Sequence, residues 1–110
     1  MNLQIGEVLL ANVEFHQASG EKIRPVVVVL DTGDDDMMAT VVTSRARLSA
    51  HEMEIAHWKA AGLNSPSTAR IHKITVFSKR RIIRHLGKLQ DEDLHRFAEL
   101  LCRTYCHRPE

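Results

Sequence analysis

The chain has 110 residues, of which 44% are hydrophobic and 26% charged, and its formal net charge is +1 at pH 7. This balance is typical of one soluble globular domain over residues 1–110, and nothing global in it demands a nucleic-acid or membrane partner. No apolar run is long enough to span a bilayer and the N-terminus lacks the pattern of a signal peptide, so we expect a cytoplasmic protein with reduced cysteines.

The first half of the chain is predicted to form three strands. Gly6–Phe15 indicates a first strand with imperfect apolar alternation, and a loop follows over His16–Lys22. The near-continuous apolar run Ile23–Leu30 predicts a strand that is buried on both faces. A turn at Asp31–Asp36 then leads into a third strand, Met37–Thr43, and the junction predicts a hairpin.

The middle of the chain is ambiguous. Ser49–Glu52 fits a capping box, which would start a helix, yet Met53–Ile55 alternates like a strand. We favour a short strand up to Ile55, followed by a helical turn around Trp58–Ala61. Gly62 would end that turn as a C-cap does.

Two more strands and one helix are expected in the last part. Thr68–Val76 and Arg81–Leu86 read as strands, and the acidic residues Asp91–Asp93 suit a helix N-terminus. Apolar residues then recur at helical spacing as far as Tyr105. Short strands, tight turns and one terminal helix indicate a mainly β protein with helices (α+β), a small β-barrel capped by a C-terminal helix.

Arg24 and the pair Thr43-Ser44 form the first candidate site. Arg24 precedes Pro25 at the start of one strand, and the two hydroxyls end the next strand, so both could meet at one spot. Arginine grips phosphate oxygens bidentately, and RNA carries its own 2′-OH nucleophile, so this combination could cleave RNA without a metal. The alternative is a strand-edge surface charge and an ordinary strand end.

A basic run is the second candidate. It could track a phosphate backbone, but such a run is usually a solvated turn and an edge strand, where charge blocks aggregation. Three further arginines would extend the patch if folding gathers them. The run consists of Lys79, Arg80, Arg81, Arg84, His85 and Lys88, and the further arginines are Arg45, Arg47 and Arg70.

The other chemistry-bearing residues favour structural roles. His51 and His57 are six residues apart, which is not the H-E-x-x-H spacing of a zinc site. A zinc site at Cys102, Cys106 and His107 would need a fourth ligand from elsewhere in the chain. Trp58 could stack on an RNA base but is more often a core or interface anchor. We expect no metal and no cofactor.

Several short motifs occur in an ordered series along the chain. Each is weak alone, but their order and spacing together are specific, and the sequence resembles the PemK/MazF-like toxin family of type II toxin–antitoxin systems from about Ile5 to Cys102. The motifs are Gly6-Glu7-Val8, Lys22–Val29 with its Arg24-Pro25, Val42-Thr43-Ser44, Gly62-Leu63 with Pro66-Ser67, Arg70–Ile74, and Leu86-Gly87-Lys88-Leu89.

The resemblance implies an SH3-like barrel, usually a homodimer, with metal-independent and sequence-selective endoribonuclease activity on single-stranded RNA, including mRNA. Cleavage in the family leaves a 2′,3′-cyclic phosphate and a 5′-hydroxyl. By the same resemblance Arg24 and Thr43 would be catalytic, and a cognate antitoxin would dock an acidic, disorder-prone tail over the dimer groove. The RNA-binding residues that we expect are Ser44, Ser67, Arg45, Arg70, Lys79 and Arg80.

Some points stay open at the level of the sequence. His72-Lys73 stand where family members often carry an acidic or amide residue, and Gln90 replaces a common helix cap. Free arginine is a poor general base, so His16 or His72 could move the proton if folding brings either one near. The alternatives are a non-catalytic SH3-like module that binds nucleic acid or protein, and a degenerate toxin that only binds its antitoxin.

Overall fold

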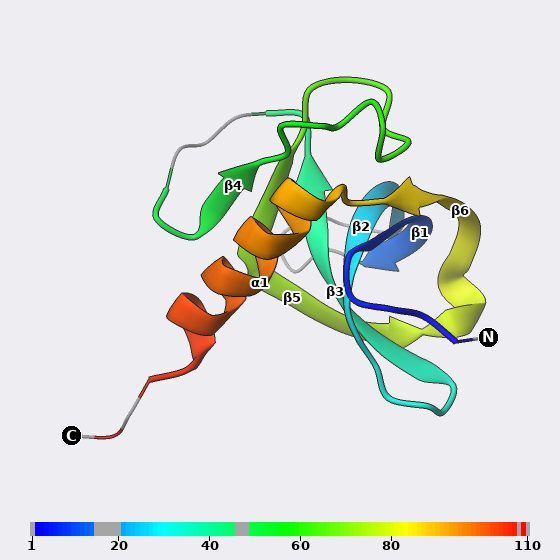
Figure 1. The fold of residues 1–110 in the computed structure, drawn as a ribbon. Coiled ribbons are helices and arrows are strands. Elements are labelled where there is room, and N and C mark those ends of the chain that lie inside the picture. The colour runs from blue at the N-terminus through cyan, green and yellow to red at the C-terminus, as the bar shows by residue number, and fades with distance from the viewer. Residues whose placement is uncertain (1, 15–20, 46–48, 108, 110) are drawn as a thin grey trace.

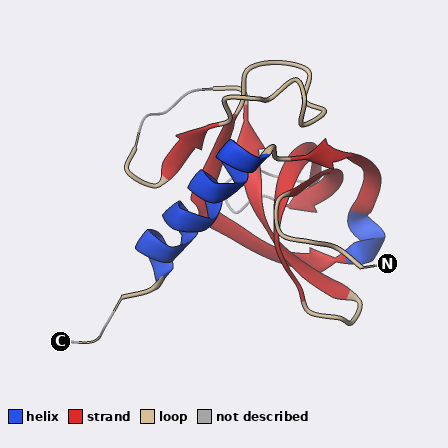
Figure 2. Ribbon diagram, in the orientation of Figure 1, coloured by secondary structure: helices blue, strands red, loops and turns tan. Residues whose placement is uncertain are grey.

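The computed structural model describes residues 2–14, 21–45, 49–107 and 109 (Figure 1). Strands dominate the described part and one α-helix follows them (Figure 2), which confirms a mainly β protein with a C-terminal helix. The elements are β1 (Glu7–Glu14), β2 (Glu21–Asp31), β3 (Asp36–Thr43), β4 (Glu52–Glu54), β5 (Thr68–Ser78), the 3₁₀ turn η1 (Lys79–Arg81), β6 (Ile82–Lys88) and α1 (Asp91–Tyr105).

The strands form one antiparallel sheet in the order β4-β5-β3-β2-β1-β6. The hairpin expected between the second and third strands is present as β2–β3, with Gly33 at a φ of +83° in its turn. The described strands do not close the ladder into a full barrel, because β4 and β6 are the two ends of the sheet. Helix α1 lies across one face of the sheet (Figure 1).

The continuous apolar run of β2 is explained by two cores, one on each face of the sheet. Val27 packs into the core beneath α1, whereas its neighbours Val26 and Val28 pack into the second core. Successive side chains of a strand point to opposite faces, so only a strand covered on both sides needs every position apolar. Burial on both faces is confirmed for Val26–Val28, whereas Ile23 and Leu30, at the ends of the predicted strand, are 60% and 50% exposed.

The ambiguous middle segment contains a short strand and a tight turn. Ser49 does not start a helix: its carbonyl accepts from the Glu52 N–H at 3.2 Å, and β4 follows. After β4, Leu63 N–H donates to the Trp58 carbonyl at 3.0 Å and Gly62 N–H to the Lys59 carbonyl at 3.1 Å. This is the bond pattern of a Schellman motif, and Gly62 has the φ of +91° that the motif requires.

The terminal strands differ from their predicted bounds at one junction. β5 continues to Ser78, whose side chain then accepts from the Arg80 N–H and caps η1. The charged run therefore contains a turn, and β6 begins only at Ile82.

Helix α1 is attached to the rest of the chain at both ends. Near its start, the buried carboxylate of Asp93 accepts from the Ala56 N–H at 3.1 Å and the His57 N–H at 2.8 Å. At its end, the Tyr105 hydroxyl donates to the Ile71 carbonyl at 2.6 Å. Phe97 lies in the core between these two points. No helix in the described residues is long and apolar enough to cross a membrane.

Candidate active site

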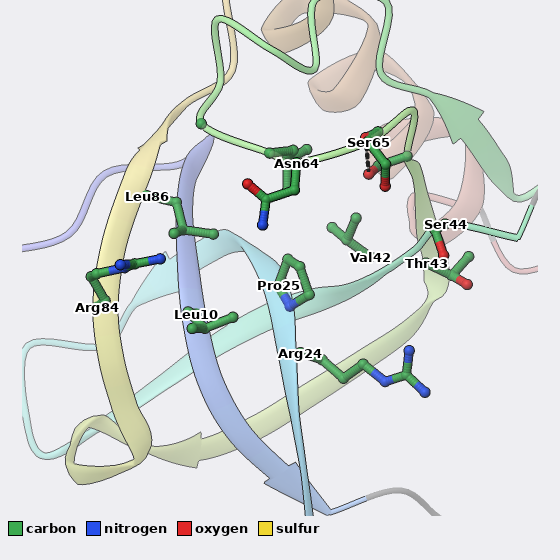
Figure 3. A pocket seen from close by; sticks show the side chains of 13 residues that line it. Leu10, Arg24, Pro25, Val42, Thr43, Ser44, Asn64, Ser65, Arg84 and Leu86 are labelled. Atoms are coloured by element: carbon green, nitrogen blue, oxygen red, sulfur yellow. Dashed lines mark hydrogen bonds between the residues drawn. The ribbon is translucent and has the colours of Figure 1, made fainter.

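A pocket of ≈ 280 Å³ lies where β2 and β3 meet the loop of residues 62–67 (Figure 3). It contains the expected site residues Arg24, Thr43, Ser44 and Ser67, together with Arg84 of the basic run. Its walls come from β1 (Leu10), β2 (Arg24, Pro25), β3 and its end (Val42, Thr43, Ser44), the loop (Gly62, Leu63, Asn64, Ser65, Ser67) and β6 (Arg84, Leu86).

Arg24 and Thr43 come from the two strands of the β2–β3 hairpin. The ladder between these strands ends at the pair Val26 and Val41, and each of the two residues lies two positions beyond that pair. Both line the same pocket. Figure 3 shows the Arg24 guanidinium extending toward the side of the pocket where Thr43 lies. Pro25 fixes the backbone beside this arginine, because its ring locks φ.

The hydroxyl groups of the pocket differ in what they can still bind. Thr43 Oγ1 accepts from the Arg45 N–H at 3.1 Å, so its own hydrogen remains to be donated. Ser67 donates its hydroxyl to the Ser65 carbonyl at 2.8 Å, which leaves its oxygen as an acceptor. Ser44 is exposed at the end of β3. Thr43 and Ser44 can therefore both donate to a phosphate oxygen, whereas the hydroxyl hydrogen of Ser67 is already engaged.

The charge of the pocket favours an anion. Among the described residues that line it, none carries a carboxylate, whereas Arg24 and Arg84 each bring a guanidinium. A planar guanidinium stays protonated and can bind two oxygens of a phosphate at once. Two guanidinium groups and hydroxyl donors are groups that suit a phosphate.

The other basic residues expected to bind RNA do not line this pocket. Arg70 pairs with Glu52, with 3.2 Å between Nε and Oε2. Lys79 pairs with Asp31 at 2.7 Å, and this contact holds the pKa of that carboxyl well below its usual range. Arg80 is exposed in η1.

Arg45 is exposed directly after Ser44, beside the pocket in sequence but outside its lining, and Arg47 lies outside the described residues.

Asn64, Ser65 and Arg84 line the pocket although the sequence did not assign them to it. Arg84 belongs to the basic run. It lies two residues before Leu86 on one strand, and residues two apart share a face, so this spacing could have predicted that both line one surface. Asn64 and Ser65 had no such signal, because a loop conformation does not follow from a periodic pattern.

The histidines proposed to move a proton are not in the lining. His72 is exposed on β5, with its ring centroid 5.9 Å from that of His51, and His16 lies outside the described residues together with most of the predicted loop. Trp58 packs against the core beneath α1, as an anchor would. In the described ranges no three His, Cys, Asp or Glu side chains gather closely enough to hold a metal ion.

Comparison with known proteins gives one family match and a consistent set of structural relatives. The family described as "PemK-like, MazF-like toxin of type II toxin-antitoxin system" matches residues 4–105. No curated protein matches the sequence significantly.

The structural relatives have low sequence identity and high coverage. The Mycobacterium tuberculosis toxin MazF-mt6 is 18% identical, with a TM-score of 0.76 over 94% of this chain and 99% of that chain. MazF of Deinococcus radiodurans is 19% identical, with a TM-score of 0.73 over 96% and 97%. An endoribonuclease from a mycobacterial species, solved with its cognate antitoxin, is 12% identical, with a TM-score of 0.78 over 99% and 100%. At these identities the relatives show a common fold.

Proposed function

Because the chain belongs to the PemK-like, MazF-like toxin family of type II toxin–antitoxin systems, we propose that it is a metal-independent, sequence-selective endoribonuclease that cleaves single-stranded RNA in the cytoplasm and so inhibits growth. The observation that carries the proposal is that Arg24 and Thr43 line one pocket whose described lining contains no carboxylate. RNA supplies the nucleophile itself, so the protein has to position a phosphate and stabilise charge.

In this mechanism Arg24 binds two non-bridging oxygens of the scissile phosphate. The 2′-oxygen attacks phosphorus in line, a bond from O2′ to phosphorus forms, and the bond to O5′ breaks. The products are a 2′,3′-cyclic phosphate and a 5′-hydroxyl. Negative charge builds on the phosphoryl oxygens during the attack, and the guanidinium stabilises that charge. One such preorganised contact is commonly worth about 10²–10³ in rate.

Thr43 donates its hydroxyl hydrogen to a phosphoryl oxygen, while the Arg45 N–H holds Oγ1 in place. The proton of the attacking 2′-OH needs an acceptor. His72 is not in the lining, so His16, which lies outside the described residues, is the side chain to test. The leaving O5′ takes a proton from solvent.

The proposed active form is a homodimer. An apolar groove of ≈ 620 Å³ lies between α1 and the sheet and is lined by Val29, Met38, Ile74 and Leu101, with Ile5 and Tyr105 at its edges. Ile5 is 42% and Tyr105 49% exposed, which places large apolar side chains at the surface together. Contiguous apolar surface of this kind marks an interface, and a second copy could cover it through an isologous contact.

An antitoxin is the second proposed partner. The mycobacterial relative was solved with its cognate antitoxin, and structures of MazE-MazF from Deinococcus radiodurans also resemble this chain. A disorder-prone acidic tail would compete with RNA for the arginines of the pocket.

The test is cleavage of mixed single-stranded RNA by the purified protein with EDTA present. We expect fragments from the wild type, far fewer in the same time from Arg24→Ala, and none when the 2′-OH at the cut site is replaced by hydrogen. RNA binding without fragments would favour the non-catalytic module. Antitoxin binding with neither RNA binding nor cleavage would favour the degenerate toxin. Mapping the 5′ ends of the fragments gives the recognised sequence.

A further inference from the structure

We infer that Asn64 and Arg84 form a base-recognition subsite in the same pocket, in which one base of a single-stranded RNA lies beside the scissile phosphate and its edge is read by the Asn64 amide. This inference rests on the proposed ribonuclease function, because it places the base next to the phosphate held by Arg24.

The floor of the subsite is a row of residues across three neighbouring strands. On β6 Arg84 lies opposite Leu10 of β1, and Leu10 lies opposite Pro25 of β2. Leu10, Pro25 and Leu86 are half-buried and line the pocket, so their free faces form an apolar surface between two arginines (Figure 3). Bases of single-stranded RNA are commonly splayed out and packed on surfaces of this kind.

The two arginines lie on opposite sides of that floor. Neighbouring strands are about 4.8 Å apart, so β6 and β2, which are separated by β1, are about 10 Å apart. Arg24 extends toward Thr43, whereas Arg84 lies on the far side beside Leu86 (Figure 3). An RNA backbone could therefore contact one guanidinium on each side of a single base.

Asn64 is presented by a loop that the fold holds in place. The Schellman bonds at Gly62 and Leu63 fix one end of the loop, and the bond from Ser67 to the Ser65 carbonyl fixes the other. Figure 3 shows the Asn64 side chain lying over the floor, on the side of Leu86 and Leu10. The base edge would thus meet a positioned amide.

Within the described part of the chain, neither the Asn64 amide nor the Arg84 guanidinium takes part in a hydrogen bond or an ion pair. An amide offers two donors and one acceptor, which can pair with a donor and an acceptor on one base edge. A guanidinium that contacts a phosphate carries no sequence information. Asn64 should therefore specify a base, and Arg84 should position the strand.

The test begins with the wild type and a pool of single-stranded RNA that is randomised around its centre. Sequencing the cut ends gives the preferred base at each position near the cut. Two oligonucleotides are then compared, the preferred one and one that differs at a single position next to the cut. For Asn64→Ala we expect the ratio of kcat/KM between the two to fall about tenfold, the discrimination that a good amide–base contact provides. Asn64→Asp, which keeps the size but loses the donors, should repeat the effect.

Arg84→Ala should give a different signature. We expect kcat/KM to fall by a similar factor on both oligonucleotides, so that their ratio stays the same, and the slope of log K against log salt to lose about one unit. Asn2→Ala and Arg103→Ala, exposed residues outside the pocket, serve as matched controls and should change neither quantity.

The inference is overturned if Asn64→Ala and Asn64→Asp keep the wild-type preference at every position near the cut while Arg24→Ala abolishes cleavage. A wild type that cuts no RNA would instead overturn the proposed function. The subsite is then tested by selecting, from an all-2′-deoxy form of the randomised pool, the strands that the wild type binds. A base preference of the wild type that disappears in Asn64→Ala supports the subsite, and a wild type that binds without base preference overturns it.

Discussion

The backbone of Gly62 crosses the backbone of Gly87 so closely that neither residue has room for a Cβ atom. A Cβ built on Gly87 would lie 2.5 Å from the Ala61 carbonyl oxygen, and one built on Gly62 would overlap the Leu86 carbonyl oxygen. The crossing brings the loop after β4 into contact with β6. Strands β4 and β6 lie at opposite ends of the sheet. The crossing therefore closes by backbone contact a sheet that the described hydrogen-bond ladder leaves open.

Gly62→Ala should destabilise the protein strongly, by about 3 kcal/mol or more, because backbone strain and a steric clash add together. Gly33→Ala is the matched control: its φ is also positive, but nothing lies within 4 Å of the added Cβ. That control should cost only about 1–2 kcal/mol. Urea unfolding of both variants measures the difference, and equal losses would show that the crossing is not tight.

Arg24→Ala and Thr43→Val should each slow RNA cleavage, by about 10²–10³ for the arginine, because each removes a group aimed at the charge of the transition state. Thr43→Ser keeps the hydroxyl and should retain more activity than Thr43→Val. The measurement is single-turnover cleavage at saturating protein. Arg103→Ala, on α1 outside the pocket, controls for the loss of a positive charge. Full activity of Arg24→Ala would remove the basis of the mechanism.

Asp93→Ala should lower the free energy of unfolding by about 3 kcal/mol, because it leaves the N–H groups of Ala56 and His57 without their acceptor and removes one of the two acceptors of Arg96. Asp91→Asn, in the same helical turn but exposed, should cost less than about 1 kcal/mol. Urea unfolding distinguishes the two. A loss in Asp93→Ala no larger than in Asp91→Asn would contradict the structural role.

Asp31 should make stability depend on acid pH. A hydrogen bond from Lys79, followed by the N–H groups of Leu3 and Gly33, holds the pKa of its carboxyl well below the ordinary value. A carboxyl with a depressed folded-state pKa stabilises the fold above its unfolded pKa of about 3.9, and that contribution is lost progressively as the pH falls below about 4.

The comparison is urea unfolding of wild type and Asp31→Asn between about pH 7 and pH 2. Asp31→Asn should be less stable than the wild type at neutral pH. The difference between their free energies of unfolding should become smaller in acid. Asp36→Asn, exposed in the same turn, is the control. If the difference in free energy of unfolding stays constant with pH, Asp31 is not the titrating group.

Ile74→Lys should shift the protein toward monomer, because it places a charge in the apolar groove beside α1. Ile83→Lys is the control, since Ile83 is 52% exposed on β6 and does not line that groove. Sedimentation or light scattering at matched concentrations gives the mass. Dimers of equal stability in both variants would place the interface elsewhere.

The two halves of the proposed site were not equally predictable. Arg24 and Thr43 lie on consecutive strands joined by a short turn, and the register of such a hairpin follows from turn and pattern. Asn64 and Arg84 come from a loop and from β6, which meet only because Gly62 and Gly87 cross. No periodic pattern in a sequence encodes a crossing of that kind.

The basic run shows a second limit of sequence patterns. Lys79 and Arg84 look alike in a list of charges, but Lys79 pairs with a carboxylate from the end of β2, whereas Arg84 lines the pocket. The pairing joins residues far apart in the chain. It also depends on the turn η1, which the pattern of charges did not predict. The helix was easier to predict, because its apolar spacing and acidic first turn are local.

The hydrogen bonds of Asp93 give the protein an order of assembly. The loop that carries Asn64 begins at Ala56 and His57, whose N–H groups are held by a carboxylate of the last helix. A chain still emerging from the ribosome therefore contains Arg24 and Thr43 well before it contains the residue that fixes the start of this loop. The turn bonds at Gly62 and Leu63 can form earlier, but the hydrogen bonds at Ala56 and His57 form only when the final helix has been synthesised and has docked.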